Sequence, residues 1–365
     1  MLRKIRAWLK LCSAPSIGAA KAIRLAKELG EPETFIELSD SPLDEISYVS
    51  AAASSFLSNK SDPVDWQKIA KIIELSELRF CSIIDDEYPE ILRRIKDAPP
   101  FLFYLGNLEA EDFRRNLAIV GTRKPSNYGK IQCEKITGEL AKRNFTIISG
   151  LAYGIDAIAH NSALKNGGRT LAVIGSSIEN IYPSSHRELA ERIIDNGAMI
   201  SEQIPGSKLN PWNFAQRNRI ISGLSQGSWI VEGGLKSGSL ITAKYAKQQQ
   251  RVVFALPGDI NRDTAMGSNL LLNQGAIPVA GYKSILTGMG ICDKETEMKA
   301  PSMAGLNDME KRIYQLLLAQ DDELEFDHLL VLSGYSVSQL ATLLLSLELK
   351  GLVRKTAGNK VYPLK

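Results

Sequence analysis

Short Val- and Ile-rich segments alternate with longer stretches of helical spacing through residues 66–285 of this 365-residue chain. A short β-branched run predicts a buried strand, and apolar positions three or four residues apart predict a helix. Strands that alternate with helices predict βαβ units, and therefore an α/β fold with a Rossmann-like, doubly wound parallel sheet covered on both faces. The expected strands are 117–120, 146–149, 170–174, 198–201, 229–232, 252–256 and 277–280.

The two ends of the chain have a different pattern. Residues 1–62 carry apolar positions at helical spacing, and Gly30 is expected to end a helix there. Polar segments at 58–63 and 289–306 predict linkers. The expected domains are thus a small helical one (1–62), a Rossmann-like one (66–288) and a C-terminal one (307–365).

The C-terminal segment predicts a winged helix. Helices are expected near 308–319, 325–332 and 336–350, and two short strands around a turn at 357–359 follow them. The last helix has no Arg or Lys before Lys350, so it is poorly suited to reading DNA bases as a transcription factor would.

Composition narrows the class of protein. Hydrophobic residues make up 44% and charged residues 23%, which is typical of a soluble globular chain. Lys10 interrupts the first apolar stretch too early for a signal peptide, and no apolar run reaches the length of about 18 residues of a membrane helix. The four cysteines and three histidines show no metal-ligand spacing. We expect a reduced, cytoplasmic protein without membrane contact, metal or cofactor.

Two loops follow expected strands, and the first of them is a candidate for binding an anion. Residues 121–129 begin with Gly121, Thr122 and Arg123, where a glycine turn, free backbone N–H groups and a guanidinium would suit a phosphate. A plain turn with a solvated arginine explains this loop as well. In the second loop, 149–156, Asp156 is expected to be a helix N-cap, and His160 a packing residue.

Two further segments carry polar residues suited to nucleic acid. In the segment 213–224, Phe214 precedes Arg217, Asn218 and Arg219, and an arginine beside an aromatic ring can bind phosphate while the ring stacks on a base. Because Arg217 and Arg219 point in different directions on a helix, one of them could form an internal pair. In the segment 237–243, small and hydroxyl residues around Ser239 predict either an anion nest or close helix packing.

These segments, in this order, make the chain similar to the DNA-processing protein A (DprA/Smf) family. The resemblance covers about residues 80–280. It is carried by the motifs at 85–89, 97–100, 121–123, 149–156, 182–183, 201–202, 217–219, 238–243, 257–258, 267–269 and 275–276. Residues 16–21 resemble a degraded helix–hairpin–helix, with Ser16 where a glycine is expected. His186 stands where many members of the family carry Asn, and Ala215 stands where many carry Pro.

The resemblance implies a function in DNA recombination. It implies single-stranded DNA binding, homodimerisation, protection of DNA taken up in natural transformation and loading of the RecA recombinase. By position, DNA would be contacted by Arg123, Lys208, Phe214, Arg217 and Arg219, in a pocket shaped by Gly121, Thr122, Ser149, Gly150, Gly154 and Ser239.

An enzymatic alternative is a nucleotide phosphoribohydrolase on a related Rossmann variant. Such enzymes carry a PGGxGTxxE motif whose glutamate assists cleavage, and the nearest segment here, 233–243, has no acid at that place. No strand is followed by GxGxxG, and no Walker A motif or nucleophile elbow is present. We therefore expect a binding protein and not an enzyme.

Overall fold

The computed structural model describes residues 1–36, 42–59, 65–292, 306–318, 324–350, 352–356 and 360–363. The chain forms two compact units, Met1–Ile291 and Cys292–Lys365. The expected linker at 289–306 lies mostly outside the described residues, as do most of the linker at 58–63 and the turn at 357–359.

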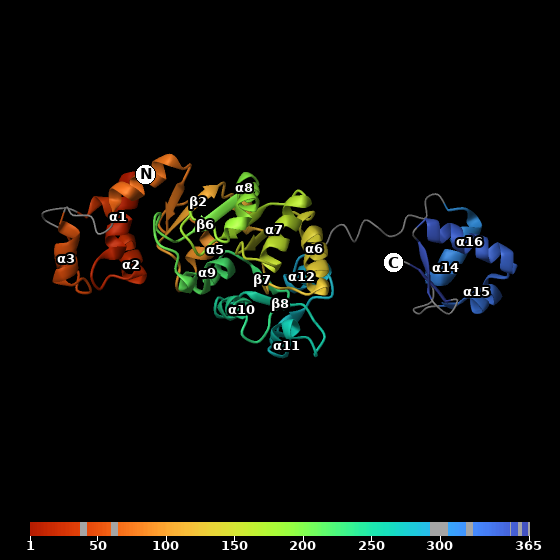
Figure 1. Ribbon diagram of the computed structural model, residues 1–365. Helices are drawn as coiled ribbons and strands as arrows, with labels where there is room; N and C mark the ends of the chain where they lie inside the picture. The colour runs from red at the N-terminus through yellow and green to blue at the C-terminus, as the bar shows by residue number, and fades with distance from the viewer. Residues whose placement is uncertain are drawn as a thin grey trace. The chain divides into compact units, whose positions relative to one another are not determined.

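A nine-stranded sheet in the order β1-β2-β6-β5-β4-β3-β7-β8-β9 forms the centre of the first unit (Figure 1). The seven expected strands are confirmed, with ends shifted by at most two residues, and they pair in parallel with one another. Their bounds are Asn116–Val120 (β3), Thr146–Ser149 (β4), Thr170–Val173 (β5), Gly197–Ser201 (β6), Gly227–Ile230 (β7), Val252–Ala255 (β8) and Ile277–Pro278 (β9).

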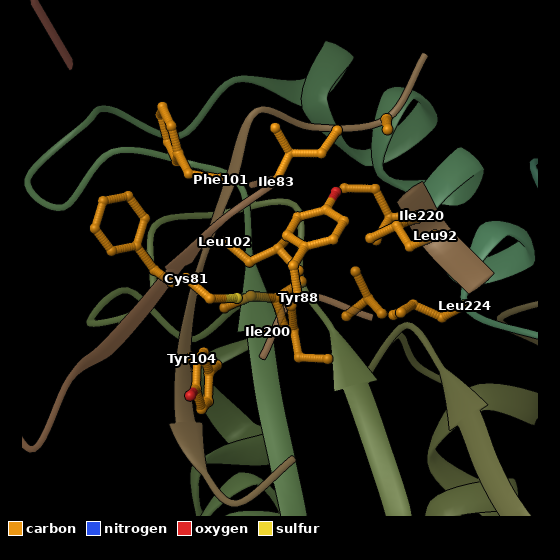
Figure 2. Packing of buried hydrophobic residues seen from close by; sticks show 14 of the residues in the cluster. Cys81, Ile83, Tyr88, Leu92, Phe101, Leu102, Tyr104, Ile200, Ile220 and Leu224 are labelled. Atoms are coloured by element: carbon orange, nitrogen blue, oxygen red, sulfur yellow. The ribbon is translucent and has the colours of Figure 1, made fainter. Parts of the chain in front are cut away.

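Two strands were not expected from the sequence. Arg79–Ser82 (β1) and Phe101–Gly106 (β2) pair antiparallel, and β2 pairs antiparallel with β6. Figure 2 shows their buried side chains, among them Phe101 and Leu102, in one cluster with Ile200 of β6 and Ile220 of the helix Pro211–Gly223 (α9). This hairpin extends the parallel sheet at the edge formed by β6.

Successive residues of the parallel strands pack into two different hydrophobic clusters, one on each face of the sheet. Leu117 and Ile119 belong to one cluster, which includes α6, α7 and α12, whereas Ala118 and Val120 belong to the other, which includes α9 and α10. Helices on both faces confirm the doubly wound class. Their bounds are Glu90–Arg93 (α5), Asn127–Ala141 (α6), Ile155–Lys165 (α7), Arg187–Asp195 (α8), Pro211–Gly223 (α9), Ser239–Gln248 (α10), Met266–Asn273 (α11) and Tyr282–Gly288 (α12).

The N-terminal helices belong to the same compact unit as the sheet, although a separate domain was expected for residues 1–62. Trp8 is fully buried, and its ring lies 6.5 Å from that of Phe101 in β2. Gly30 ends α2 with a φ of 88°, as expected, and Ser16 has a φ of 62° at the place where a glycine was expected. The helices are Leu2–Ser13 (α1), Ala19–Leu29 (α2), Ala51–Ser58 (α3) and Trp66–Leu75 (α4).

The second unit has its own hydrophobic core and the expected winged-helix order of elements. Of the leucines crowded on its last helix, Leu340 and Leu344 are fully buried, whereas Leu345 and Leu349 are exposed. In the described part of the chain, no single helix could span a membrane by length and composition; α15 and α16 pass that test only as a pair, bent by 108°. The elements are Asp308–Leu318 (α14), Leu324–Glu325 (β10), Phe326–Ser333 (α15), Val337–Leu349 (α16), Val353–Thr356 (β11) and Lys360–Pro363 (β12).

Candidate nucleic-acid interface

A cavity of about 620 Å³ lies where β3 and β7 end. After β3 the chain adds β4, β5 and β6 on one side of the sheet, and it returns to the other side of β3 with β7. Such a switch in strand order opens a crevice at the carboxyl ends of the strands, the usual ligand site of this fold. The lining residues are Val120–Lys124, Ala152, Asp156, Pro211, Phe214, Ala215, Arg217, Asn218, Gly234, Lys236–Ser239, Ile241 and Thr242.

The loop after β3 forms one wall, with exposed Arg123 and Lys124. Gly121 is required there, because a Cβ atom would approach the Ile155 side chain to 2.6 Å. The backbone N–H of Thr122 donates to the carbonyl of Glu232 at 2.7 Å, which ties the loop to the segment just after β7. Two cations are therefore presented from a fixed backbone.

Glu232 holds the far end of the same loop. Its buried carboxylate accepts from the backbone N–H of Ser126 at 2.8 Å and from the Ser126 hydroxyl at 2.6 Å. The Ser126 Oγ in turn accepts from the Gly129 N–H at 3.1 Å and so caps α6. Sequence reasoning did not single out Glu232, because its partners lie 106 residues away in the chain.

Arg217 forms the floor of the cavity. Its buried guanidinium donates through Nη1 to the carbonyls of Gly150, at 2.6 Å, and of Val173, and through Nε to Asn218 Oδ1 at 3.2 Å. Nη2 has no hydrogen-bond partner in the described part of the chain. Burial lowers the pKa of Arg217 to about 10, Asp156 opposes that shift, and Arg123 adds to it. The charge is thus retained at neutral pH with one nitrogen left for a ligand.

Asp156 is not the N-cap of α7, which corrects the expectation from the sequence. The N-cap is Gly154, with a φ of 78°, and Asp156 lies inside the first turn. Burial raises the pKa of the Asp156 carboxyl, whereas Arg217 and the N–H groups of Ala152, Gly150 and Gly121 lower it. The carboxylate organises the backbone under the cavity. His160, one turn on, is buried against Thr170 as expected, with burial lowering its pKa to about 3.

Phe214 forms the opposite wall, from the first turns of α9. It packs on Gly175 after β5, where a Cβ atom would meet the ring at 2.9 Å. Its ring lies 5.3 Å from that of Tyr182. Asn218, two turns from the start of α9, is buried as expected and donates to the carbonyl of Gly238 at 3.2 Å.

The segment that starts α10 completes the cavity. Ser239 is buried at the first position of the helix, and its hydroxyl lies 2.8 Å from that of Ser237. Lys236 adds an exposed cation to the lining. Lys124 and Lys236 were missed from the sequence, although their positions just after β3 and β7 could have indicated them once the switch in strand order was placed between these two strands.

Five of the expected site residues do not line this cavity. Ser149 is buried and donates to the carbonyl of Ile119 at 2.6 Å. Gly150 and Gly154 lie behind the wall, where a Cβ atom would contact Arg217 and the Thr122 carbonyl respectively. Lys208 is exposed on the loop after β6.

Arg219 is the fifth: the resemblance implies that it lines the DNA pocket, but it does not line this cavity. It pairs with Glu202 at 2.5 Å and with Asp97 at 3.6 Å, and it faces a different cavity. Two residues apart on a helix, Arg217 and Arg219 point about 200° apart. The sequence left open which of the two arginines forms an internal ion pair, and the structure shows that Arg219 does.

Asp156 is the only carboxylate among the lining residues of the cavity, and backbone N–H groups and Arg217 already surround it. In the described part of the chain, no group of three or more His, Cys, Asp or Glu side chains could hold a metal ion.

Comparison with known proteins identifies the family. The family model described as DNA recombination-mediator protein A matches residues 79–290, and the model of the DprA winged helix domain matches residues 297–359. Protein Smf of Synechocystis is 35% identical over 315 residues, which cover 77% of this chain and 79% of that protein.

Two solved structures of high structural similarity are also 31% identical in sequence. DNA processing protein A of Streptococcus pneumoniae has a TM-score of 0.65 and covers 78% of this chain and 95% of its own. DNA processing protein A of Helicobacter pylori has a TM-score of 0.52 and covers 58% and 94%. The chain therefore belongs to the DNA recombination-mediator protein A family, the DprA/Smf proteins.

Proposed function

We propose that this protein binds single-stranded DNA in the cavity at the β3–β7 switch and does not alter it chemically. The observation that carries the proposal is the set of cations there. Arg123, Lys124 and Lys236 stand on the walls, and Arg217 offers a free nitrogen from the floor. Phosphate contacts of this kind supply most of the affinity for nucleic acid.

Phe214 favours a single strand over a duplex. Its ring lies on the wall beside the cations, where an unpaired base could stack while its phosphate contacts an arginine. Bases inside a duplex present no free face to such a ring. The solved H. pylori relative, whose structure describes a single-stranded DNA binding mode, supports the same assignment here.

The wider role proposed is in recombination. We infer that the protein acts as a cytoplasmic homodimer that protects incoming single strands and loads the RecA recombinase onto them. This part of the proposal rests on membership of the DNA recombination-mediator family and on what the resemblance of the sequence implies. A bound but chemically unchanged strand is what a loading factor must pass on.

We expect single-stranded oligonucleotides to bind more tightly than blunt duplexes of the same length. The affinity should fall with salt, with a log–log slope of about −0.7 per phosphate neutralised. Fluorescence anisotropy with both ligands at two or more salt concentrations measures the preference and the slope. Equal or tighter binding of the duplex would contradict the proposal.

We also expect no hydrolysis of nucleotides. Asp156, the one carboxylate among the lining residues, already accepts backbone hydrogen bonds, so no lining carboxylate is free to assist glycosidic cleavage. Incubation of the protein with nucleoside monophosphates, followed by chromatography for free base, measures any turnover. Release of base by independently purified preparations would favour the phosphoribohydrolase.

A further inference from the structure

Two exposed tyrosines lie beside the cavity but do not line it. Tyr182 is 41% exposed, although its ring lies 5.3 Å from Phe214 on the wall. Tyr153 is 45% exposed and follows Ala152, which lines the cavity. The Tyr182 hydroxyl has no hydrogen-bond partner in the described part of the chain, so a hydrogen bond within the protein does not account for a tyrosine at this position.

The strands that precede these tyrosines show on which side of the cavity the two side chains lie. Tyr153 belongs to the loop after β4 and Tyr182 to the loop after β5, the two strands that follow β3 on the side away from β7. The next strand, β6, is followed by the loop with exposed Lys208. Aromatic rings and then a cation thus continue from the cavity along the carboxyl ends of three adjacent strands.

Tyr153 is held in place by the neighbouring loop. Its hydroxyl lies 3.0 Å from that of Ser185, and its ring meets His186 edge to face at 4.9 Å between centroids. The Nδ1 of His186 donates to the carbonyl of Leu151 at 2.9 Å. An exposed ring fixed in this way loses little conformational entropy when a base stacks on it.

The other side of the cavity is less favourable to a strand. The loop after β8 carries Asp259 and Asp263, both exposed. Their carboxylates would repel phosphates at close range, and Arg262 of the same loop is paired with Glu232. On the opposite side, the loops after β4 and β5 carry one exposed carboxylate, Glu179, which accepts hydrogen bonds from the Ser177 hydroxyl and the Gly206 N–H.

We propose that single-stranded DNA leaves the cavity across the ends of β4 and β5, and that Tyr182, next to Phe214, stacks on a base outside the cavity, with Tyr153 further along the same path. The inference rests on the proposed function and adds the path of the strand and a second stacking site. Lys208 then contacts the phosphates at the far end of that path.

The test compares two replacements of Tyr182. Leucine keeps the apolar bulk without an aromatic face, and phenylalanine keeps the ring. Their affinities are measured by anisotropy on an oligothymidylate and on an abasic strand of the same length, which keeps the phosphates and lacks the bases. We expect Tyr182→Leu to weaken binding of the oligothymidylate about tenfold, in the range of one stacked base, and to leave the abasic strand unaffected. Tyr182→Phe should bind as the unaltered protein does.

Tyr128 provides the matched control. It is a 39% exposed tyrosine on the other side of the cavity, and its hydroxyl donates to the carbonyl of Pro257. Tyr128→Leu should leave both affinities unchanged, and thermal unfolding verifies that all variants fold.

Three outcomes would overturn the inference: full affinity in Tyr182→Leu, an equal loss of affinity for the abasic strand, or an equal loss in Tyr128→Leu. If the unaltered protein fails to bind single strands, the proposed function itself is wrong.

Discussion

Replacing Arg217 with leucine is expected to lower the free energy of unfolding by about 3–5 kcal/mol, because it leaves a buried charge without its partner. The guanidinium joins the loop after β4, through Gly150, to the end of β5, through Val173. It also offsets the negative charge of buried Asp156. Chemical denaturation of the unaltered protein and the variant measures the difference.

A second substitution, at Asp156, separates the effect of the unpaired buried charge from the effect of lost packing. In the double variant Asp156→Asn, Arg217→Leu neither charge remains buried, so part of the lost stability should return. Arg219→Leu removes an arginine of the same helix that pairs with Glu202 outside the cavity, and it should not couple to Asp156→Asn. Simple addition of the Asp156 and Arg217 effects would show that the two charges do not act together.

Arg123→Ala is expected to weaken single-stranded DNA binding about tenfold for every base sequence, since a charge-assisted hydrogen bond to phosphate is lost. The salt slope should flatten by about 0.7 for one phosphate contact. The fold should be unaffected, because Arg123 is exposed on its loop. Anisotropy titrations at several salt concentrations measure both quantities.

Arg115 offers the matched control. It is an exposed arginine just before the amino end of β3, whereas Arg123 lies just beyond the carboxyl end. Both changes remove one positive charge, so the net charge of the two variants is equal. If Arg115→Ala weakens binding as much as Arg123→Ala does, the effect comes from overall charge and not from the cavity.

The parallel part of the sheet could be predicted from the sequence, because each of its strands is a short buried run between helices. The hairpin of β1 and β2 could not, since these two strands pair antiparallel with only the four-residue helix α5 between them, so they form no βαβ unit. The contact of the N-terminal helices with the sheet could not be predicted for a similar reason. Helical periodicity shows that Trp8 faces a core, but not that the core includes Phe101.

At the candidate site, local sequence identified the segments better than the roles of single residues. Arg123, Phe214 and Arg217 do meet in one cavity, as expected. The role of Asp156 depends on a backbone that folds back over it, and the role of Arg219 depends on Glu202 in another loop. Contacts between distant segments of this kind leave no periodic signal in the sequence.

The pairing of β3 with β7 also has a kinetic consequence. Asn116 at the start of β3 accepts from the backbone N–H of Gln226, 110 residues later, and the cavity has one wall from each of these distant regions. Contacts of such long sequence separation form slowly, because a large loop must close before they contribute. During synthesis on the ribosome, the nascent chain would carry Arg123 long before it could assemble the cavity. The cavity would then be complete only after β7 and the segments that follow it have docked.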